Sequence, residues 1–260
     1  MMNNRFLWLI FLLPLLFSCQ EKYTTKPFDE KEKILRQYPL EDTRSLVLDS
    51  LWDKRDSLTY LRLKDHVKTI GMNDVTYIPN WIGKFNKVEI FLVVNEKSKK
   101  IKKIPSSIGK LSNLLEFNIR KNEVNSIPET FYNLQKLKNV CFENNNIETI
   151  SSNISKLENL RSLKISNNPL KFLPSEICNL NKLETLVLEN TKINELPSCL
   201  GSLRNLDWIN VSGTQLTEFP IEILNAPKLD EIDAKGLKLK NYKEVKAICE
   251  KKNINFHYDE

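Results

Sequence analysis

The side chains that could carry out covalent or acid–base chemistry are few in this 260-residue chain and stand far apart. The only histidines are His66 and His257, and none of the five cysteines forms the C-x-x-C spacing typical of zinc and dithiol centres. A metal site or a Cys–His catalytic couple would need a histidine to meet Cys141 across several structural units. We therefore expect no enzyme activity, no catalytic residue, no metal and no cofactor.

The polar residues of the central part recur at a fixed spacing instead. The stretch LKISNNPLKFLPSEICNL, at 163–180, is followed twenty-three residues later by LVLENTKINELPSCLGSL. Units begin at residues 67, 88, 114, 137, 160, 183 and 206, and a partial unit begins at residue 229. A fixed period of about 20 to 50 residues indicates a repeat architecture, in which stacked units share one core.

Each unit reads approximately L-x-x-L-x-L-x-x-N-x-L-x-x-L-P-x-x-I-x-x-L-x-x. The alternation in Leu163-Lys164-Ile165 predicts a short strand with both apolar side chains on one face. Asn168 follows at the bend, where its amide is expected to bond backbone groups that would otherwise be buried unpaired. Its equivalents are Asn122, Asn145, Thr191 and Thr214, and threonine keeps only part of that capacity. Proline fixes φ after the strand at residues 128, 174, 197 and 220, with Ser151 as a departure.

This pattern closely resembles that of the leucine-rich repeat family, in its twenty-three-residue form, over about residues 67–240. The resemblance implies an α/β solenoid: a curved stack with a parallel concave sheet, an irregular or 3₁₀ convex side, and a cap at each end. A fold of this kind presents a variable surface on a constant framework, but it specifies no chemistry.

Both ends of the solenoid, which we place at 67–239, are expected to carry caps. For the N-terminal cap, at 42–66, the apolar spacing predicts a helix from Asp42 to about Arg55, followed by an antiparallel hairpin between 58–63 and 67–72. The C-terminal cap, at 240–260, is expected to be a helix followed by a short strand. Asn241 and Glu244 have the spacing of a capping box at the start of a helix to about Lys252, and Ile254–His257 reads as the strand.

The first eighteen residues have the features of a secretory signal. A positive charge at Arg5 precedes an apolar run from Phe6 to Phe17. The run is shorter than the roughly twenty residues of a membrane span and contains Pro14, which suits a signal core better. Residues 1–18 are therefore expected to be removed as a signal peptide.

The sequence Leu16-Phe17-Ser18-Cys19 resembles the lipobox of bacterial lipoproteins. The resemblance implies that Cys19 is diacylated, becomes the new N-terminus and anchors the protein to a membrane, with residues 19–41 as a charged tether. By family analogy, Gln20 favours the outer membrane of the cell envelope over the inner one. The alternative is an ordinary cleaved signal with an incidental cysteine.

Two groups of residues on the expected concave face are candidates for binding a partner. One is the apolar set Ile90, Leu92 and Val94 beside Glu116 and Arg120. It either contacts a partner or is covered by the tether, the cap or the insertion within 95–100. The other is Trp208 with Asn210 and Glu231, because tryptophan is enriched at binding hot spots. Trp208 either binds or folds over the C-terminal cap.

The function predicted from these features is a non-enzymatic, membrane-anchored module that binds a protein or peptide. The alternative is a structural cell-envelope lipoprotein, with or without glycan association, that has no specific protein ligand. Glycan binding would favour several outward aromatic residues, and Trp208 is the one that the outward positions offer. The formal net charge of +6 becomes +5 without Arg5, and no basic stripe indicates nucleic-acid binding. The oligomeric state, the side of the membrane that the protein faces and the pairing of Cys178 with Cys199 stay open.

Overall fold

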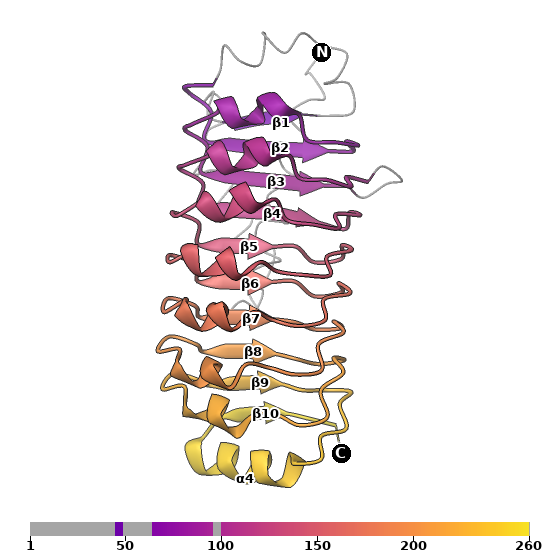
Figure 1. Cartoon of the computed structure of the whole chain (residues 1–260), viewed down its shortest axis with the longest axis vertical. Coiled ribbons are helices and arrows are strands. Elements are labelled where there is room, and N and C mark those ends of the chain that lie inside the picture. Colours follow the sequence, from indigo (N-terminus) through magenta and orange to yellow (C-terminus); the bar gives the residue numbers. More distant parts are fainter. Residues whose placement is uncertain (1–44, 49–63, 96–99, 260) are drawn as a thin grey trace, which may run out of the picture.

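The computed structural model describes residues 45–48, 64–95 and 100–259 of the chain. This part is an elongated stack of coils in which strands and 3₁₀ helices alternate along the sequence (Figure 1). The strands form one ten-stranded sheet whose spatial order, β1 to β10, is the order of the sequence. Every neighbouring pair is parallel. The expected α/β solenoid with a parallel sheet is confirmed.

The eight strands expected at the repeat starts are β2 to β9, and one further strand flanks them at each end. The bounds are β1 Ser45–Leu48, β2 Thr69–Asn73, β3 Ile90–Val94, β4 Glu116–Arg120, β5 Asn139–Cys141, β6 Ser162–Lys164, β7 Thr185–Val187, β8 Trp208–Asn210, β9 Glu231–Asp233 and β10 Asn255–His257.

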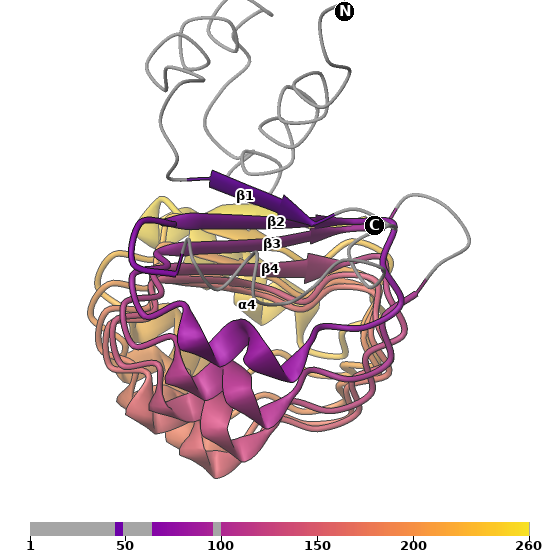
Figure 2. The ribbon, with the colours of Figure 1, turned by 90° about the horizontal axis from the view of Figure 1, so that it is seen from above.

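The return segments on the opposite side of the stack are 3₁₀ helices of one or two turns (Figure 2). Their bounds are η2 Asn80–Lys84, η3 Ser106–Lys110, η4 Glu129–Asn133, η5 Ser152–Lys156, η6 Ser175–Asn179, η7 Ser198–Ser202 and η8 Ile221–Asn225. A short 3₁₀ helix lets the chain reverse within a 23-residue coil, and each one buries one or two apolar residues, such as Ile177 of η6.

The core is continuous from coil to coil because the inward apolar positions stack on one another. In β6 and the residue after it, Leu163 and Ile165 are buried as the alternation predicted. Aromatic residues fill the N-terminal half, where the ring of Phe117 lies 5.4 Å from that of Phe91 and 5.1 Å from that of Phe131. No single coil encloses these side chains, so the repeats are stable only as a stack.

A column of buried side-chain amides joins the coils just beyond the strands. Asn168 accepts a bond from the backbone N–H of Ile147 in the preceding coil (2.9 Å) and donates to the carbonyls of Phe142 and Ile165 (both 2.9 Å). Asn145 accepts in the same way from the N–H of Val124 (3.1 Å). The role expected for these residues is confirmed, since each amide satisfies backbone groups of two coils.

The column begins one coil earlier than the sequence indicated and changes character towards the C-terminus. Asn95, at the edge of the insertion, bonds both backbone groups of Val75 and donates to the side chain of Asn122 (2.9 Å). Thr191 and Thr214 instead donate to a carbonyl three residues earlier (2.7 Å each). Threonine thus keeps only part of the bonding capacity of asparagine, as expected, and the bond that it keeps lies within its own coil.

The prolines precede the 3₁₀ helices as N-caps with extended backbone angles, which explains their fixed place in the repeat. Ser151 takes this position in η5, and its hydroxyl accepts a bond from the N–H of Asn153 (3.2 Å). Its own N–H, which a proline would lack, donates to the hydroxyl of Tyr132 (3.2 Å). Burial raises the pKa of that Tyr132 hydroxyl to about 12. The Tyr132 hydroxyl therefore satisfies the backbone N–H that Ser151 has and a proline would lack.

The N-terminal cap differs from the prediction. Ser45–Leu48 is a strand, β1, parallel to β2, where a helix from Asp42 to Arg55 was expected. Because β1 and β3 occupy the two edges of β2, the predicted antiparallel hairpin on that strand is also wrong. The turn at 64–66 is present. The rest of the predicted helix and the segment 58–63 lie outside the described residues.

The C-terminal cap is as predicted in its elements but not in its capping interaction. Helix α4 spans Tyr242–Lys252 and β10 follows it. Asn241 makes no side-chain capping bond to the helix, so the predicted capping box is wrong. Its amide bonds the N–H and carbonyl of Phe219 instead (3.1 and 2.8 Å), because the neighbouring coil offers two buried backbone groups.

Replacing Asn168 with alanine should lower the free energy of unfolding by about 2 to 4 kcal/mol, because an N–H and carbonyls of two coils lose their partner. Asn168→Thr should cost less, since Thr191 shows that a hydroxyl still satisfies one carbonyl. The measurement is urea denaturation followed by circular dichroism. The exposed Asn125→Ala is the matched control, expected within about 0.5 kcal/mol of the parent. Equal stability of Asn168→Ala and the control would contradict the role of the column.

Candidate functional site

The outward side of strands β2 to β10, which we call the sheet face, carries the candidate binding residues. Neighbouring strands run in register, so equivalent residues of successive repeats form straight rows across the face. One row runs from Asn139 through Ser162 and Thr185 to Trp208, and the next from Cys141 through Lys164. The position of an outward residue within its repeat therefore determines the row of the sheet face in which it lies.

Near the C-terminal end of the sheet face the structure brings five residues together, which we call the C-terminal cluster: Lys164, Trp208, Glu231, Asp233 and His257. The indole N–H of Trp208 donates to Oδ2 of Asp233 (2.6 Å). The Nζ of Lys164 lies 5.8 Å from the centre of the Trp208 ring. The Nε2 of His257 lies 3.5 Å from Oε1 of Glu231. Four strands contribute to this cluster, so its geometry depends on the stack.

Lys164 belongs to β6 and Trp208 to β8, so the lysine side chain crosses β7 to reach the ring. It is buried, with 6% of its surface exposed, and Val187 of β7 is buried as well. A cation over an aromatic face is attracted by the ring quadrupole by about 0.5 to 2 kcal/mol. Together with the bond to Asp233, this contact holds the half-buried indole in one orientation.

Asn210, which the sequence grouped with Trp208, lies on the same strand but has a different role. Its side-chain oxygen accepts a bond from the N–H of Ser212 (2.9 Å), so it shapes the bend after β8. Glu231, the third member of the predicted group, lies on β9 as the register partner of Trp208. Trp208 and Glu231 are therefore adjacent on neighbouring strands, whereas Asn210 bonds the bend after its own strand.

At the N-terminal end of the sheet face, the predicted apolar patch is not an exposed surface at its centre. Leu92 is buried with 3% exposed, while Ile90 is half-buried. Of the two alternatives for this set, burial is the one observed at Leu92. The side chain of Val94 lies outside the described residues.

Glu116 and Arg120 lie on β4, and both are half-buried. Burial raises the pKa of the Glu116 carboxyl above its ordinary value, although a bond from the Asn139 amide (3.3 Å) and the charge of Lys138 oppose the shift. The two predicted groups do not meet. Five strand spacings separate β3 from β8, which is roughly 24 Å.

Sequence reasoning missed the partnership of Asp233 and His257 with Trp208 and Glu231. Asp233 is two residues after Glu231 on one strand, which places both on the same face and was a usable signal. His257 was assigned to the cap, and its position opposite Asp233 follows only from the register of β10 on β9. Its nearness to Glu231 therefore depends on how α4 returns the chain to the sheet.

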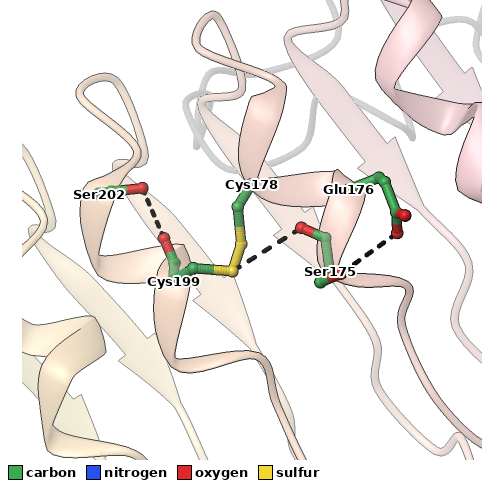
Figure 3. Close-up of a disulfide and its surroundings, with 5 residues drawn as sticks. All are labelled: Ser175, Glu176, Cys178, Cys199 and Ser202. Carbon is green, nitrogen blue, oxygen red and sulfur yellow. Dashed lines mark hydrogen bonds between the residues drawn. A yellow bond between two sulfur atoms is a disulfide. The ribbon is translucent and has the colours of Figure 1, made fainter.

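The remaining reactive side chains lie elsewhere in the described part of the chain. Cys178 of η6 and Cys199 of η7 form a disulfide, with their Cα atoms 5.8 Å apart (Figure 3). This settles the pairing left open by the sequence. Cys141 and Cys249 remain thiols and are buried, and burial raises the pKa of Cys249 to about 11. His66 lies in the exposed turn before β2, far along the stack from His257.

Within the described ranges, no helix has the length and apolar character needed to cross a bilayer.

Comparison with known proteins identifies the fold. A family model described as "Leucine-rich repeat region" matches residues 144–254. A leucine-rich repeat protein of Leptospira interrogans is similar in structure, with a TM-score of 0.60, 22% identity, and coverage of 90% of this chain and 71% of that chain. An internalin from Listeria monocytogenes gives a TM-score of 0.62 at 19% identity, covering 77% of this chain and 58% of that one.

The leucine-rich repeat ectodomain of a plant membrane receptor kinase, GASSHO1/SCHENGEN3 from Arabidopsis thaliana, is similar as well. Its TM-score is 0.62 at 23% identity, covering 75% of this chain and 23% of the receptor chain. Comparison with curated proteins finds no match. The chain therefore has the leucine-rich repeat fold.

Replacing Glu116 with glutamine should stabilise the protein at pH 7, because a half-buried carboxylate is exchanged for a neutral group of the same shape. The raised pKa means that the cost of the buried charge is present above the folded-state pKa and disappears as pH falls below the ordinary carboxyl range. The midpoint of urea denaturation of Glu116→Gln should therefore exceed that of the parent at pH 7 and converge with it at acid pH. Exposed Glu158→Gln serves as control. A gain that is the same at both pH values would contradict this assignment.

Proposed function

We propose that this protein is a non-enzymatic, membrane-anchored module that binds a protein or an extended peptide on the sheet face, with the C-terminal cluster as its anchor point. The observation that carries the proposal is the orientation of Trp208 by its bond to Asp233 and by the ammonium group of Lys164 over its ring. Binding hot spots are enriched in tryptophan because its ring offers a large apolar area together with a polar edge.

A side chain that is already ordered loses little conformational freedom when a partner packs on it. Immobilising a flexible side chain at an interface costs about 0.5 to 1.5 kcal/mol, and the contacts of Trp208 remove most of that cost in advance. The row beside it is small and polar at Ser162 and Thr185, both half-buried. A partner lying across the strands would therefore contact small polar side chains first and then the oriented ring of Trp208.

The similar proteins support binding of this kind by analogy. The plant receptor ectodomain is described in complex with CASPARIAN STRIP INTEGRITY FACTOR 2. A plant peptide hormone receptor, RGFR1, is described in complex with RGF2, at a TM-score of 0.58 and 23% identity. This chain spans only 23% and 34% of those two chains, so the analogy extends to the use of a repeat surface for a polypeptide ligand.

The proposed anchor is the diacylated Cys19, in a cell-envelope protein that belongs to the outer membrane by the analogy drawn from Gln20. The disulfide between Cys178 and Cys199 supports a place outside the cytoplasm, because such bonds persist in oxidising compartments. A protein tethered in this way would present its sheet face to partners at the membrane surface.

A photo-crosslinking amino acid at Thr185, next to Trp208 on the sheet face, should capture a polypeptide partner in intact cells, while the same group at Lys182 should not. Trp208→Ala should weaken binding of that partner by more than roughly 1 kcal/mol, about fivefold in Kd, with an unchanged circular dichroism spectrum. Lys182→Ala is the control, because it removes only an exposed side chain whose Nζ donates to Oδ1 of Asn159. Crosslinking of the partner from position 182 but not from position 185 would show that the partner binds outside the sheet face.

Cys19→Ser should release the protein from membranes into the soluble fraction, because acylation through sulfur is then impossible. The measurement is sedimentation of membranes washed in high salt, with Cys249→Ser as a cysteine control outside the expected lipobox. If the Cys19→Ser protein still sediments with membranes, a different anchor or an ordinary signal is at work.

A further inference from the structure

We propose that Glu231, Asp233 and His257 form a site for a divalent transition-metal ion, with Zn²⁺ as the ion of best fit. The ligating atoms of the three side chains all lie within 4.8 Å of one another. No metal was expected from the sequence, because His257 was assigned to the C-terminal cap. The site consists of three of the five residues of the C-terminal cluster, and it does not depend on the proposed binding of a polypeptide.

The distances suit tetrahedral zinc. With metal–ligand bonds of about 2.0 to 2.2 Å, two ligands of such an ion lie about 3.4 Å apart. The Nε2 of His257 and Oε1 of Glu231 are 3.5 Å apart already. The ligand atom of Asp233 lies within 4.8 Å of the other two. The three ligand atoms are therefore close to the separation that a shared ion requires.

The backbone under the site is hydrogen-bonded between two paired strands. Asp233 and His257 are register partners on β9 and β10, and Glu231 precedes Asp233 by two residues on the same face. The N–H of Ala234 donates to the carbonyl of His257 (2.8 Å), and the N–H of Asn255 donates to that of Asp230 (2.7 Å). Metal ligands carried by paired strands are held more precisely than ligands on loops.

An outer contact orients one of the proposed ligands. Trp208 donates its indole N–H to Oδ2 of Asp233, which leaves Oδ1 as the oxygen to face an ion. Hydrogen bonds of this type fix the direction of a ligating carboxylate and are a regular part of metal sites. Trp208 would therefore report on the ion as well as support it.

The donor set selects the class of ion. An imidazole nitrogen favours zinc, copper, nickel or iron, whereas calcium and magnesium require oxygen ligands throughout. Two carboxylates balance the charge of a divalent ion. Glu231 and His257 keep 23% and 46% of their side-chain surface exposed, so an ion could enter and would retain at least one position for water or another ligand.

The experiment is titration of the full chain, purified in detergent, with Zn²⁺ by calorimetry. We expect one Zn²⁺ per chain, with binding at least about tenfold weaker in Glu231→Gln, Asp233→Asn and His257→Ala. His66→Ala, which removes the other histidine, should bind like the parent. Ca²⁺ and Mg²⁺ should not compete. Circular dichroism checks that each variant is folded, and the two amide variants preserve the shape of the site.

A second readout separates this site from the cysteines. Cu²⁺ should quench part of the tryptophan fluorescence of the parent, and this quenching should be lost in His257→Ala, which removes a ligand but keeps Trp208. The Co²⁺ complex should show no thiolate charge-transfer band. Absence of Zn²⁺ binding by the parent, equal binding by His257→Ala, or loss of binding in His66→Ala would each overturn the proposal.

Discussion

The column of buried amides beside the sheet is the constraint on which the rest of the structure depends. Each coil leaves backbone groups inside the stack that neither its own strand nor its 3₁₀ helix satisfies, and an unpaired buried group costs about 1 to 3 kcal/mol. Asn145 and Asn168 bond such groups in their own coil and in the one before. Neighbouring coils are thereby tied at a fixed offset, which allows the apolar positions beneath to stack without gaps.

The same offset determines what the sheet face can present. Because the strands remain in register from β2 to β10, side chains from distant repeats meet at predictable places. Lys164 reaches Trp208 across one intervening strand, and His257 reaches Glu231 from the last strand. Both contacts join residues more than twenty positions apart in the sequence. The proposed binding surface and the proposed metal site thus use outward positions, which the core of the fold does not require to be apolar.

Local periodicity was sufficient to predict the repeats, because strand alternation, the Asn position and the Pro position lie within one coil. The errors occurred where a distant partner decides the outcome. Ser45–Leu48 is a strand because β2 offers it a free edge, although its neighbours have helical spacing. Asn241 bonds Phe219 in the adjacent coil in place of its own helix. The burial of Leu92 and the nearness of His257 to Glu231 likewise depend on contacts between distant parts of the chain, which no local sequence pattern contains.

Hydrogen–deuterium exchange of single backbone amides tests the central role of the column most directly. The N–H groups of Val124 and Ile147 donate to buried asparagine side chains, whereas Thr191 and Thr214 direct their hydroxyls to carbonyls of their own coil. We predict that Val124 and Ile147 exchange more slowly than their repeat equivalents Leu170 and Ile193. Equal exchange rates at the four positions would show that the amide column does not tie the coils together.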